Sequence, residues 1–261
     1  MRALQCLPIL VLAALPLAAQ SAAEHIARGD SANPLMHPDV ALRHYQAALA
    51  LDSLNFEANW KAAKAISDVA KQLLGDSTKD QRDSLYSIGR GYAERALRVD
   101  STRAEGHYAV ALVLGRLSRT RGGKERVRFA RIIFDEATRA VAIDSTLDAA
   151  YHILGAWHAE VKRLSGFTRF FAKTLFGAGF MSRANWPDAV KNLERAVALN
   201  PRNIYHRLEL AEVFEDLDQY SKAREQLEVI ATLPITDVMD PHHKQEAAAL
   251  LIEIRDKKDK T

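Results

Sequence analysis

Four segments of the chain repeat one pattern, and this repetition limits the possible folds more than any other feature of the sequence. The segments are AALALDS, RALRVDS, RAVAIDS and RAVALNP, and they end at Ser53, Ser101, Ser145 and Pro201. Each has an alanine five residues before its last residue, with an apolar residue directly after the alanine and another two positions further on. Repetition at such intervals is typical of stacked structural units that bury a shared core.

Small residues recur at a second fixed place, ten positions after each of these turns. The small residues are Ala63, Ala111, Gly155 and Ala211, and the larger residues three positions later are Ile66, Leu114, His158 and Phe214. This resembles the tetratricopeptide repeat, in which small residues allow two antiparallel helices to approach and bulky ones fill the seam. The sequence therefore predicts an all-α fold, a tetratricopeptide-like α-solenoid whose helix pairs form a right-handed superhelix.

The pattern divides residues 21–240 into five units, roughly 22–53, 54–101, 102–145, 146–201 and 202–234. Steps of 48, 44 and 56 residues between the turns exceed the family standard of about 34. The excess is expected between the two helices of a unit, and the largest excess is a helical insertion at 161–186. Residues 241–261 predict a C-terminal capping helix with a polar tail. The pairs Asp52-Ser53, Asp100-Ser101 and Asp144-Ser145 are each expected to close one helix and cap the next.

Residues 1–20 have the composition of a signal peptide. Arg2 precedes the apolar run LPILVLAALPL at residues 7–17, and small residues follow, so cleavage is expected between Ala19 and Ala23. The alternative is an uncleaved N-terminal anchor. Cleavage predicts an exported protein, periplasmic or secreted, without a transmembrane segment in the mature chain. The single cysteine, Cys6, lies in the predicted signal peptide, so the mature chain is expected to lack disulfides and cysteine sites.

The remaining residue patterns argue against several kinds of chemistry. A formal net charge of +3 predicts no general attraction to nucleic acid. His152 and His158 are six residues apart, on different sides of a helix, and His242 and His243 are expected to be a solvated pair, so no metal site is predicted. Carboxylates such as Glu209 and Glu212 predict exposed ion-paired faces. No nucleophile with an ordered base and acid is visible, and no cofactor motif is present, so an enzyme is the weakest hypothesis.

Seven basic residues fall within sixteen positions, with Glu125 as the only acid among them. They are Arg116, Arg119, Arg121, Lys124, Arg126, Arg128 and Arg131. Such a run predicts a positive surface for phosphate-bearing head groups or an acidic partner. The alternative is a solvated helix face without a ligand.

An aromatic segment, LSGFTRFFAKTLFG, lies in the predicted insertion. Its apolar residues Phe167, Phe170, Phe171 and Phe176 recur at helical spacing, while Lys173 lies on the opposite side. One interpretation is that these rings pack as core against a neighbouring unit. The other is that they line an apolar groove with a basic rim, which suits an amphipathic lipid.

The run HILGAWHAEV, the aromatic segment and the helix WPDAVKNLERAVALNP together resemble the regulator of microtubule dynamics family. The resemblance implies a tetratricopeptide-like domain with this insertion, an association with microtubules in animal cells, and phospholipid binding by the repeat domain of a membrane-anchored member. The residues that match the shared run, and that the resemblance makes candidates for a pocket, are His152, Trp157, Glu160, Phe170, Phe171, Lys173 and Phe176.

The sequence as a whole predicts a non-enzymatic binding or scaffold protein. A concave face lined by Trp60, Tyr108 and Tyr151 would receive a peptide or helix of a partner protein. The alternative function is binding or transfer of phospholipid or another amphipathic lipid through the aromatic segment, with the basic run holding the head group.

Overall fold

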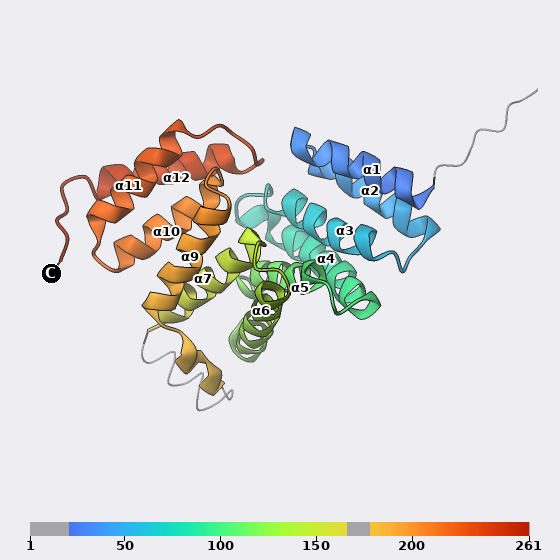
Figure 1. Ribbon diagram of the computed structural model, residues 1–261, viewed down its shortest axis with the longest axis horizontal. Coiled ribbons are helices and arrows are strands. Elements are labelled where there is room, and N and C mark those ends of the chain that lie inside the picture. The colour runs from blue at the N-terminus through green and yellow to red at the C-terminus, as the bar shows by residue number, and fades with distance from the viewer. Residues whose placement is uncertain (1–20, 166–177, 261) are drawn as a thin grey trace, which may run out of the picture.

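The computed structural model describes residues 21–165 and 178–260. In this part of the chain the regular secondary structure is helical (Figure 1). It contains eleven α-helices and three short 3-10 helices, and these ranges contain no β-strand. The prediction of an all-α array of helix pairs is confirmed. The predicted signal peptide lies outside the described residues and stays a prediction. No helix within the described ranges is long and apolar enough to cross a membrane.

Ten of the helices form five antiparallel pairs. The first helices of the pairs are α1 (Ala22–Ala32), α3 (Phe56–Ala70), α5 (Ala104–Ser118), α7 (Asp148–Arg163) and α10 (Ile204–Asp216). The second helices are α2 (Pro38–Leu51), α4 (Lys79–Val99), α6 (Gly123–Ile143), α9 (Trp186–Leu199) and α11 (Tyr220–Thr232). A further helix, α12 (Asp240–Glu253), packs on α10 and α11 and covers the end of the last pair.

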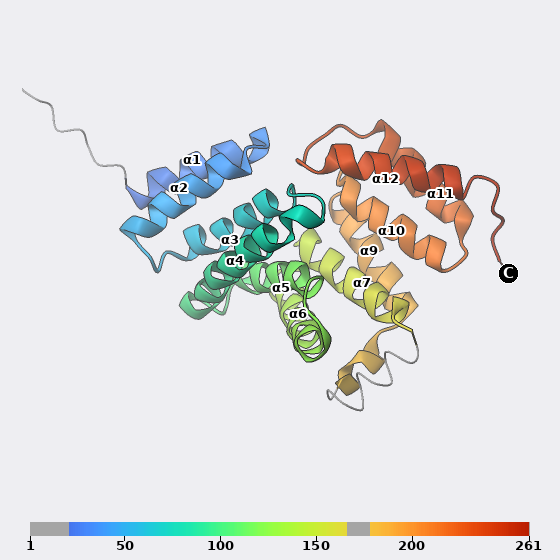
Figure 2. The ribbon, with the colours of Figure 1, turned by 180° about the vertical axis from the view of Figure 1, so that it is seen from behind.

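The pairs are arranged in two layers. From α3 onward, each first helix contacts the first helix of the next pair: α3 contacts α5, α5 contacts α7, and α7 contacts α10. The second helices pack on their own partners and on the first helix that follows them. The first helices therefore line an inner face, and the second helices lie outside it (Figures 1 and 2).

Small residues allow the helices of each pair to approach closely, at the positions where the sequence repeats. The repeated residues Ala48, Ala96, Ala140 and Ala196, together with Ala63, Ala111 and Ala211, have no exposed surface. At Gly155 a Cβ atom would lie only 2.5 Å from Cγ of Leu193 in the partner helix α9. A larger residue at these places would need the backbones to separate.

The aspartates at the joints between units close the preceding helices as expected, but they do not cap the following ones. Asp52, Asp100 and Asp144 each follow the last residue of a second helix, and their carboxylates accept the backbone N–H two residues later at 3.2, 2.9 and 2.8 Å. They close the turn and do not cap the next helix. Where a side-chain cap exists, an asparagine further along provides it, as Asn55 does for α3 by accepting the Ala58 N–H at 3.0 Å.

The longer units extend their second helices. Both α4 and α6 have 21 residues, whereas α2 has 14. In the fourth unit, the described part of the predicted insertion is the end of α7, a 3-10 helix η3 (Ala178–Arg183) and the start of α9. Helix η3 packs on α6, while residues 166–177 lie outside the described part of the chain. The two other 3-10 helices are η1 (Asn33–Leu35) and η2 (Asp76–Thr78).

Candidate functional site: the inner face of the repeat array

Four helices, α5, α7, α10 and α12, bring together two neighbouring groups of charged and aromatic side chains. Helix α10 supplies Tyr205 and His206 from its first turn, where Asn203 caps the helix by accepting the His206 N–H at 3.1 Å. The acid-rich side of α10 continues toward its C-terminal end. Two neighbouring groups result, one aromatic and one of ion pairs.

The aromatic group joins α7, α10 and α12. Nδ1 of His152 lies 3.2 Å from Nδ1 of His206, whose Nε2 lies 3.0 Å from the Asp148 carboxylate. If Nε2 of a neutral His206 donates to Asp148, its Nδ1 accepts a hydrogen bond from His152. Tyr205 lies between two imidazoles, with centroid distances of 4.5 Å to His152 and 4.7 Å to His243.

Burial favours the uncharged form of His152 and of His243. It lowers the pKa of His152 well below the ordinary value, and the positive charges of Arg116 and Arg119 act in the same direction. Burial also lowers the pKa of His243 to about 4, and Lys71 and Arg116 add to the effect. His243 was expected to be solvated, but its ring stacks on Tyr205 and its Nδ1 is buried without a partner in the described residues. That expectation was wrong because α12 docks this histidine against α10.

The ion-pair group is centred on Arg163 at the end of α7. Its guanidinium lies within 4 Å of four carboxylates, those of Glu160 (3.3 Å), Glu209 (3.3 Å), Glu212 (3.7 Å) and Asp216 (2.8 Å). Burial alone would lower the pKa of Arg163, but the carboxylates of Glu209 and Asp216 raise it above the ordinary value. The four acids outnumber Arg163 and the nearby Arg119, so the group has more acidic than basic side chains.

Burial raises the pKa values of two glutamates on α10, and neighbouring carboxylates add to the effect. Burial raises the pKa of Glu209 despite the nearby charges of Arg163 and Arg119. Burial and the charge of Glu209 together raise the pKa of Glu212 to about 7. The expected exposed face is wrong for Glu209, whose side chain is only 6% exposed and pairs with an arginine on another helix. The Glu212 side chain is 40% exposed and accessible to a partner.

Of the predicted site residues, only some meet on this face. His152 and Glu160 contribute to the two groups just described. Tyr108 is buried on α5, where burial raises its pKa to about 12. Trp60 is half-buried on α3, and its indole N–H donates to Glu57 at 2.9 Å. Tyr151 lies toward the outer layer, with its ring 5.8 Å from the guanidinium of Arg195 on α9.

Trp157 is a buried residue of the core between α6 and α7. Its indole N–H donates to the Ala130 carbonyl at 2.7 Å, and its ring lies 4.5 Å from that of Phe134 and 6.2 Å from that of Phe180. The other candidates, Phe167, Phe170, Phe171, Lys173 and Phe176, lie outside the described residues.

The predicted basic patch is divided between two sides of the molecule. Arg116 on α5 faces inward, with its guanidinium 5.8 Å from the Tyr205 ring, and the Tyr205 hydroxyl helps to raise the pKa of Arg119. Arg121 pairs with Asp83 at 3.2 Å. The remaining members, Lys124, Arg126, Arg128 and Arg131, are exposed along the first half of α6. The Arg131 guanidinium lies 4.7 Å from the ring of Phe180 in η3.

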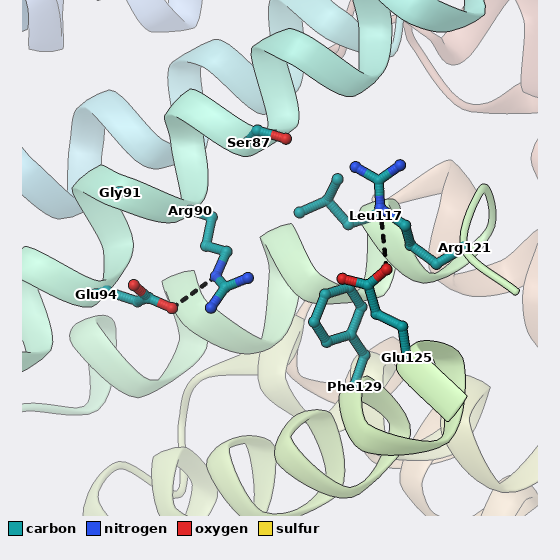
Figure 3. A pocket seen from close by; sticks show the side chains of 8 residues that line it. All are labelled: Ser87, Arg90, Gly91, Glu94, Leu117, Arg121, Glu125 and Phe129. Carbon is teal, nitrogen blue, oxygen red and sulfur yellow. Dashed lines mark hydrogen bonds and ion pairs between the residues drawn. The ribbon is translucent and has the colours of Figure 1, made fainter. Parts of the chain in front are cut away.

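A cavity of about 290 Å³ lies on the outer side, between α4 and α6 (Figure 3). Its walls carry two ion pairs, Arg90 with Glu94 at 2.6 Å and Arg121 with Glu125 at 3.7 Å, above Phe129. Because each arginine already has a carboxylate partner, this cavity offers less unpaired charge than the inner face.

Six residues of the inner face were missed as site residues in the sequence: Arg163, Tyr205, His206, Glu209, Glu212 and His243. A signal was present for three acids, because Glu209, Glu212 and Asp216 follow one side of a helix at spacings of three and four. No comparable signal links Tyr205 to His243, which belong to different helices.

The fold and this face define a class, that of tetratricopeptide-like helical-repeat proteins. The structure is similar to that of a thermophilic TPR protein of Thermus thermophilus, with a TM-score of 0.63 over 88% of this chain and 99% of that one. It is also similar to PilF of Pseudomonas aeruginosa, with a TM-score of 0.52 over 90% of this chain and 86% of that one. Sequence identities of 14% and 15% limit both likenesses to the fold.

Within that class, the chain belongs to the family of regulator of microtubule dynamics proteins 1–3, whose family model matches residues 25–255. It is 26% identical to regulator of microtubule dynamics protein 3 of Xenopus laevis, over 67% of this chain and 37% of that protein. It is 22% identical to the human protein 2, over 76% of this chain and 48% of that protein. The chain thus spans between about a third and a half of the length of these relatives. The predicted resemblance to this family is confirmed.

Proposed function

We propose that the protein is a non-enzymatic scaffold whose inner face, on α5, α7 and α10, binds an extended segment or helix of a partner protein. The observation that carries the proposal is the set of four carboxylates around Arg163. Helical-repeat arrays generally use such inner faces for binding. Surplus negative charge that remains partly exposed at Glu160 and Glu212 favours a segment with basic side chains.

The neighbouring groups give such a segment a second kind of contact. Arg119 on α5 is exposed and its charge lies near Glu209, and Arg116 on the same helix lies over Tyr205. A partner segment with basic residues toward α10 and an acidic residue toward α5 would match both helices. Charge complementarity of this kind determines orientation and specificity more than affinity.

Selection of peptides from a displayed random library tests the proposal. The purified protein should select peptides with lysine or arginine, and Glu212→Lys should weaken their binding at least tenfold. The matched control is Glu194→Lys, which makes the same charge change at an exposed position of the outer helix α9. Selected peptides that bind both variants equally, or a library that yields no binder, would refute binding on the inner face.

A second candidate function is the binding of amphipathic lipid near η3. The observation that favours it is the contact of Arg131 with the half-buried ring of Phe180, a pairing of a cation with an aromatic ring just after the aromatic segment in the sequence. Native mass spectrometry of the purified protein separates the two candidates. A retained lipid that is lost in the variant Phe180→Ser supports this site, and a lipid-free mass of the unmodified protein argues against it.

A further inference from the structure

The loop between α11 and α12, residues 233–239, reaches back to the N-terminal half of the array. Nζ of Lys71, just after α3, lies 2.9 Å from each carboxylate oxygen of Asp237 in this loop. The two residues are 166 positions apart in the sequence. The loop lies near the end of α3 and the start of α2, so the array is closed into a ring (Figures 1 and 2).

The loop is held in a shape that presents Asp237 to α3. The Asp240 carboxylate accepts the backbone N–H groups of Thr236 at 2.7 Å and of Asp237 at 2.8 Å. On the other side, Lys71 is also 2.9 Å from Asp68, which pairs with Lys64 at 2.8 Å. Each half of the contact is therefore organised within its own part of the chain, and the bond between Lys71 and Asp237 joins them.

The closure is made by this loop and not by an interface between helices. A cavity of about 130 Å³ lies beside the ion pair, between the loop, η1 and α3. In the part of the chain that the structure describes, no helix from α1 to α4 has an extensive interface with α10, α11 or α12. The Asp237 side chain is 42% exposed and that of Lys71 is 14% exposed, so water and salt reach the carboxylate side of the ion pair.

We propose that residues 233–239 are a strap that opens and closes the ring at the pair of Lys71 and Asp237. Because the two ends meet through one loop and not through packed helices, they can separate at this ion pair without unpacking any pair of helices. Because the strap continues into α12, which carries His243 onto the inner face, opening at this pair changes access to that face. The strap goes beyond the proposed function and does not depend on it, since it is a property of the chain without any ligand.

A distance between spin labels on the two halves tests the strap. Cysteines at Leu51 on α2 and Ile252 on α12 are suitable because these side chains are 58% and 64% exposed. The single natural cysteine is removed as Cys6→Ser. Double electron–electron resonance should give one main distance in about 50 mM NaCl. A second, longer distance should increase at least threefold in about 1 M NaCl, where charges are screened within about 3 Å.

Substitutions distinguish the loss of the ion pair between Lys71 and Asp237 from other effects of salt. Asp237→Asn and Lys71→Met should each increase the longer distance at the lower salt concentration. The matched control is Asp218→Asn, which removes the 2.9 Å pair of Asp218 with Lys260 elsewhere on the surface and should change nothing. One unchanged distance in high salt and in both variants would overturn the proposal, as would the same change in the control. Circular dichroism confirms that each variant is folded, and the salt measurement needs no variant of the pair.

Discussion

At the scale of single residues, small side chains at recurring positions decide how closely the helices approach. Gly155 and Gly115 show the difference between a glycine that packing requires and one that it does not. A Cβ atom at Gly155 would lie 2.5 Å from Leu193 Cγ and 3.0 Å from the Ala189 carbonyl oxygen, whereas one at Gly115 would have no atom within 4 Å. Both glycines lie inside helices, but only at Gly155 would an added Cβ atom meet neighbouring atoms. Substitution by alanine therefore has opposite expected effects at the two positions.

Gly155→Ala should lower the free energy of unfolding by about 1–2 kcal/mol, because overpacking costs about 1–3 kcal/mol and the better helix propensity of alanine returns part of it. Gly115→Ala should raise it by about 0.5–1 kcal/mol. Urea denaturation of both variants measures these changes. Equal effects of the two substitutions would contradict the packing described for α7 and α9.

Arg163 is the second residue whose removal has a predictable cost. Arg163→Met leaves the buried Glu209 carboxylate without its cation and should lower the free energy of unfolding by about 3 kcal/mol at pH 8. Adding Glu209→Gln should recover at least half of that loss, because the uncompensated charge is then absent. A double-mutant cycle measured by chemical denaturation at pH 8 tests this, and simple additivity of the two substitutions would contradict it.

The sequence predicted the packing residues better than the site residues, for a physical reason. Ala48, Ala63 and Gly155 recur at fixed offsets because every pair needs a close approach at the same place. The contact of Tyr205 with His243 occurs once, between helices whose relative angle no periodic pattern encodes. The spacing of His152 and His158 predicted that they face different sides, and they do contact different partners, His206 and Asn185.

At the scale of elements, α12 is the helix whose docking depends most clearly on protonation. The free energy of its contact with α10 includes a neutral His243 ring stacked on Tyr205. Facing this ring are the acids Asp237 and Asp240 and the cations Lys71 and Arg116, and burial is the largest of the effects that lower its pKa to about 4.

Stability should therefore fall as the pH decreases from about 6.5 to 4. In this window the unfolded histidine takes up a proton and the folded one does not, so protonation favours unfolding. His243→Phe keeps the ring stack and removes the titration, so its free energy of unfolding should decrease less over the same window. Glu212 acts in the opposite direction, since its raised pKa weakens folding as the pH rises from 4.5 to about 7.

Comparison of the two proteins at each pH isolates the histidine, because the contribution of Glu212 is common to both. Urea denaturation between pH 4 and pH 8 is the measurement. Parallel pH profiles for the protein and its His243→Phe variant would show that this histidine is protonated equally in the folded and unfolded states.

The insertion in the fourth unit shows how far sequence reasoning reaches for an element. The extra length between α7 and α9 was evident from the 56-residue step between turns. The part that the structure describes, η3, packs Phe180 against Arg131 and near Trp157. Helical periodicity alone could not decide between core and groove for Phe167 to Phe176, because both uses need the same apolar spacing.

At the scale of the whole molecule, the array of helix pairs was predicted and its closure was not. Each repeat specifies contacts with its neighbours, and the prediction of stacked pairs follows from that. The curvature of the array is the sum of small rotations between successive pairs, which depend on side-chain volumes at every joint. No local pattern around Lys71 or Asp237 indicates that these rotations bring the two residues within 2.9 Å.

The contact between Lys71 and Asp237 also has a consequence for how such a chain can change in length. A helical array can gain or lose a module where its joints are alike, as are the turns closed by Asp52, Asp100 and Asp144 in this chain. Here a duplicated or deleted module would move Asp237 away from Lys71, and the ion pair between them could not form. The number of modules is thereby tied to the ability of the two ends to meet.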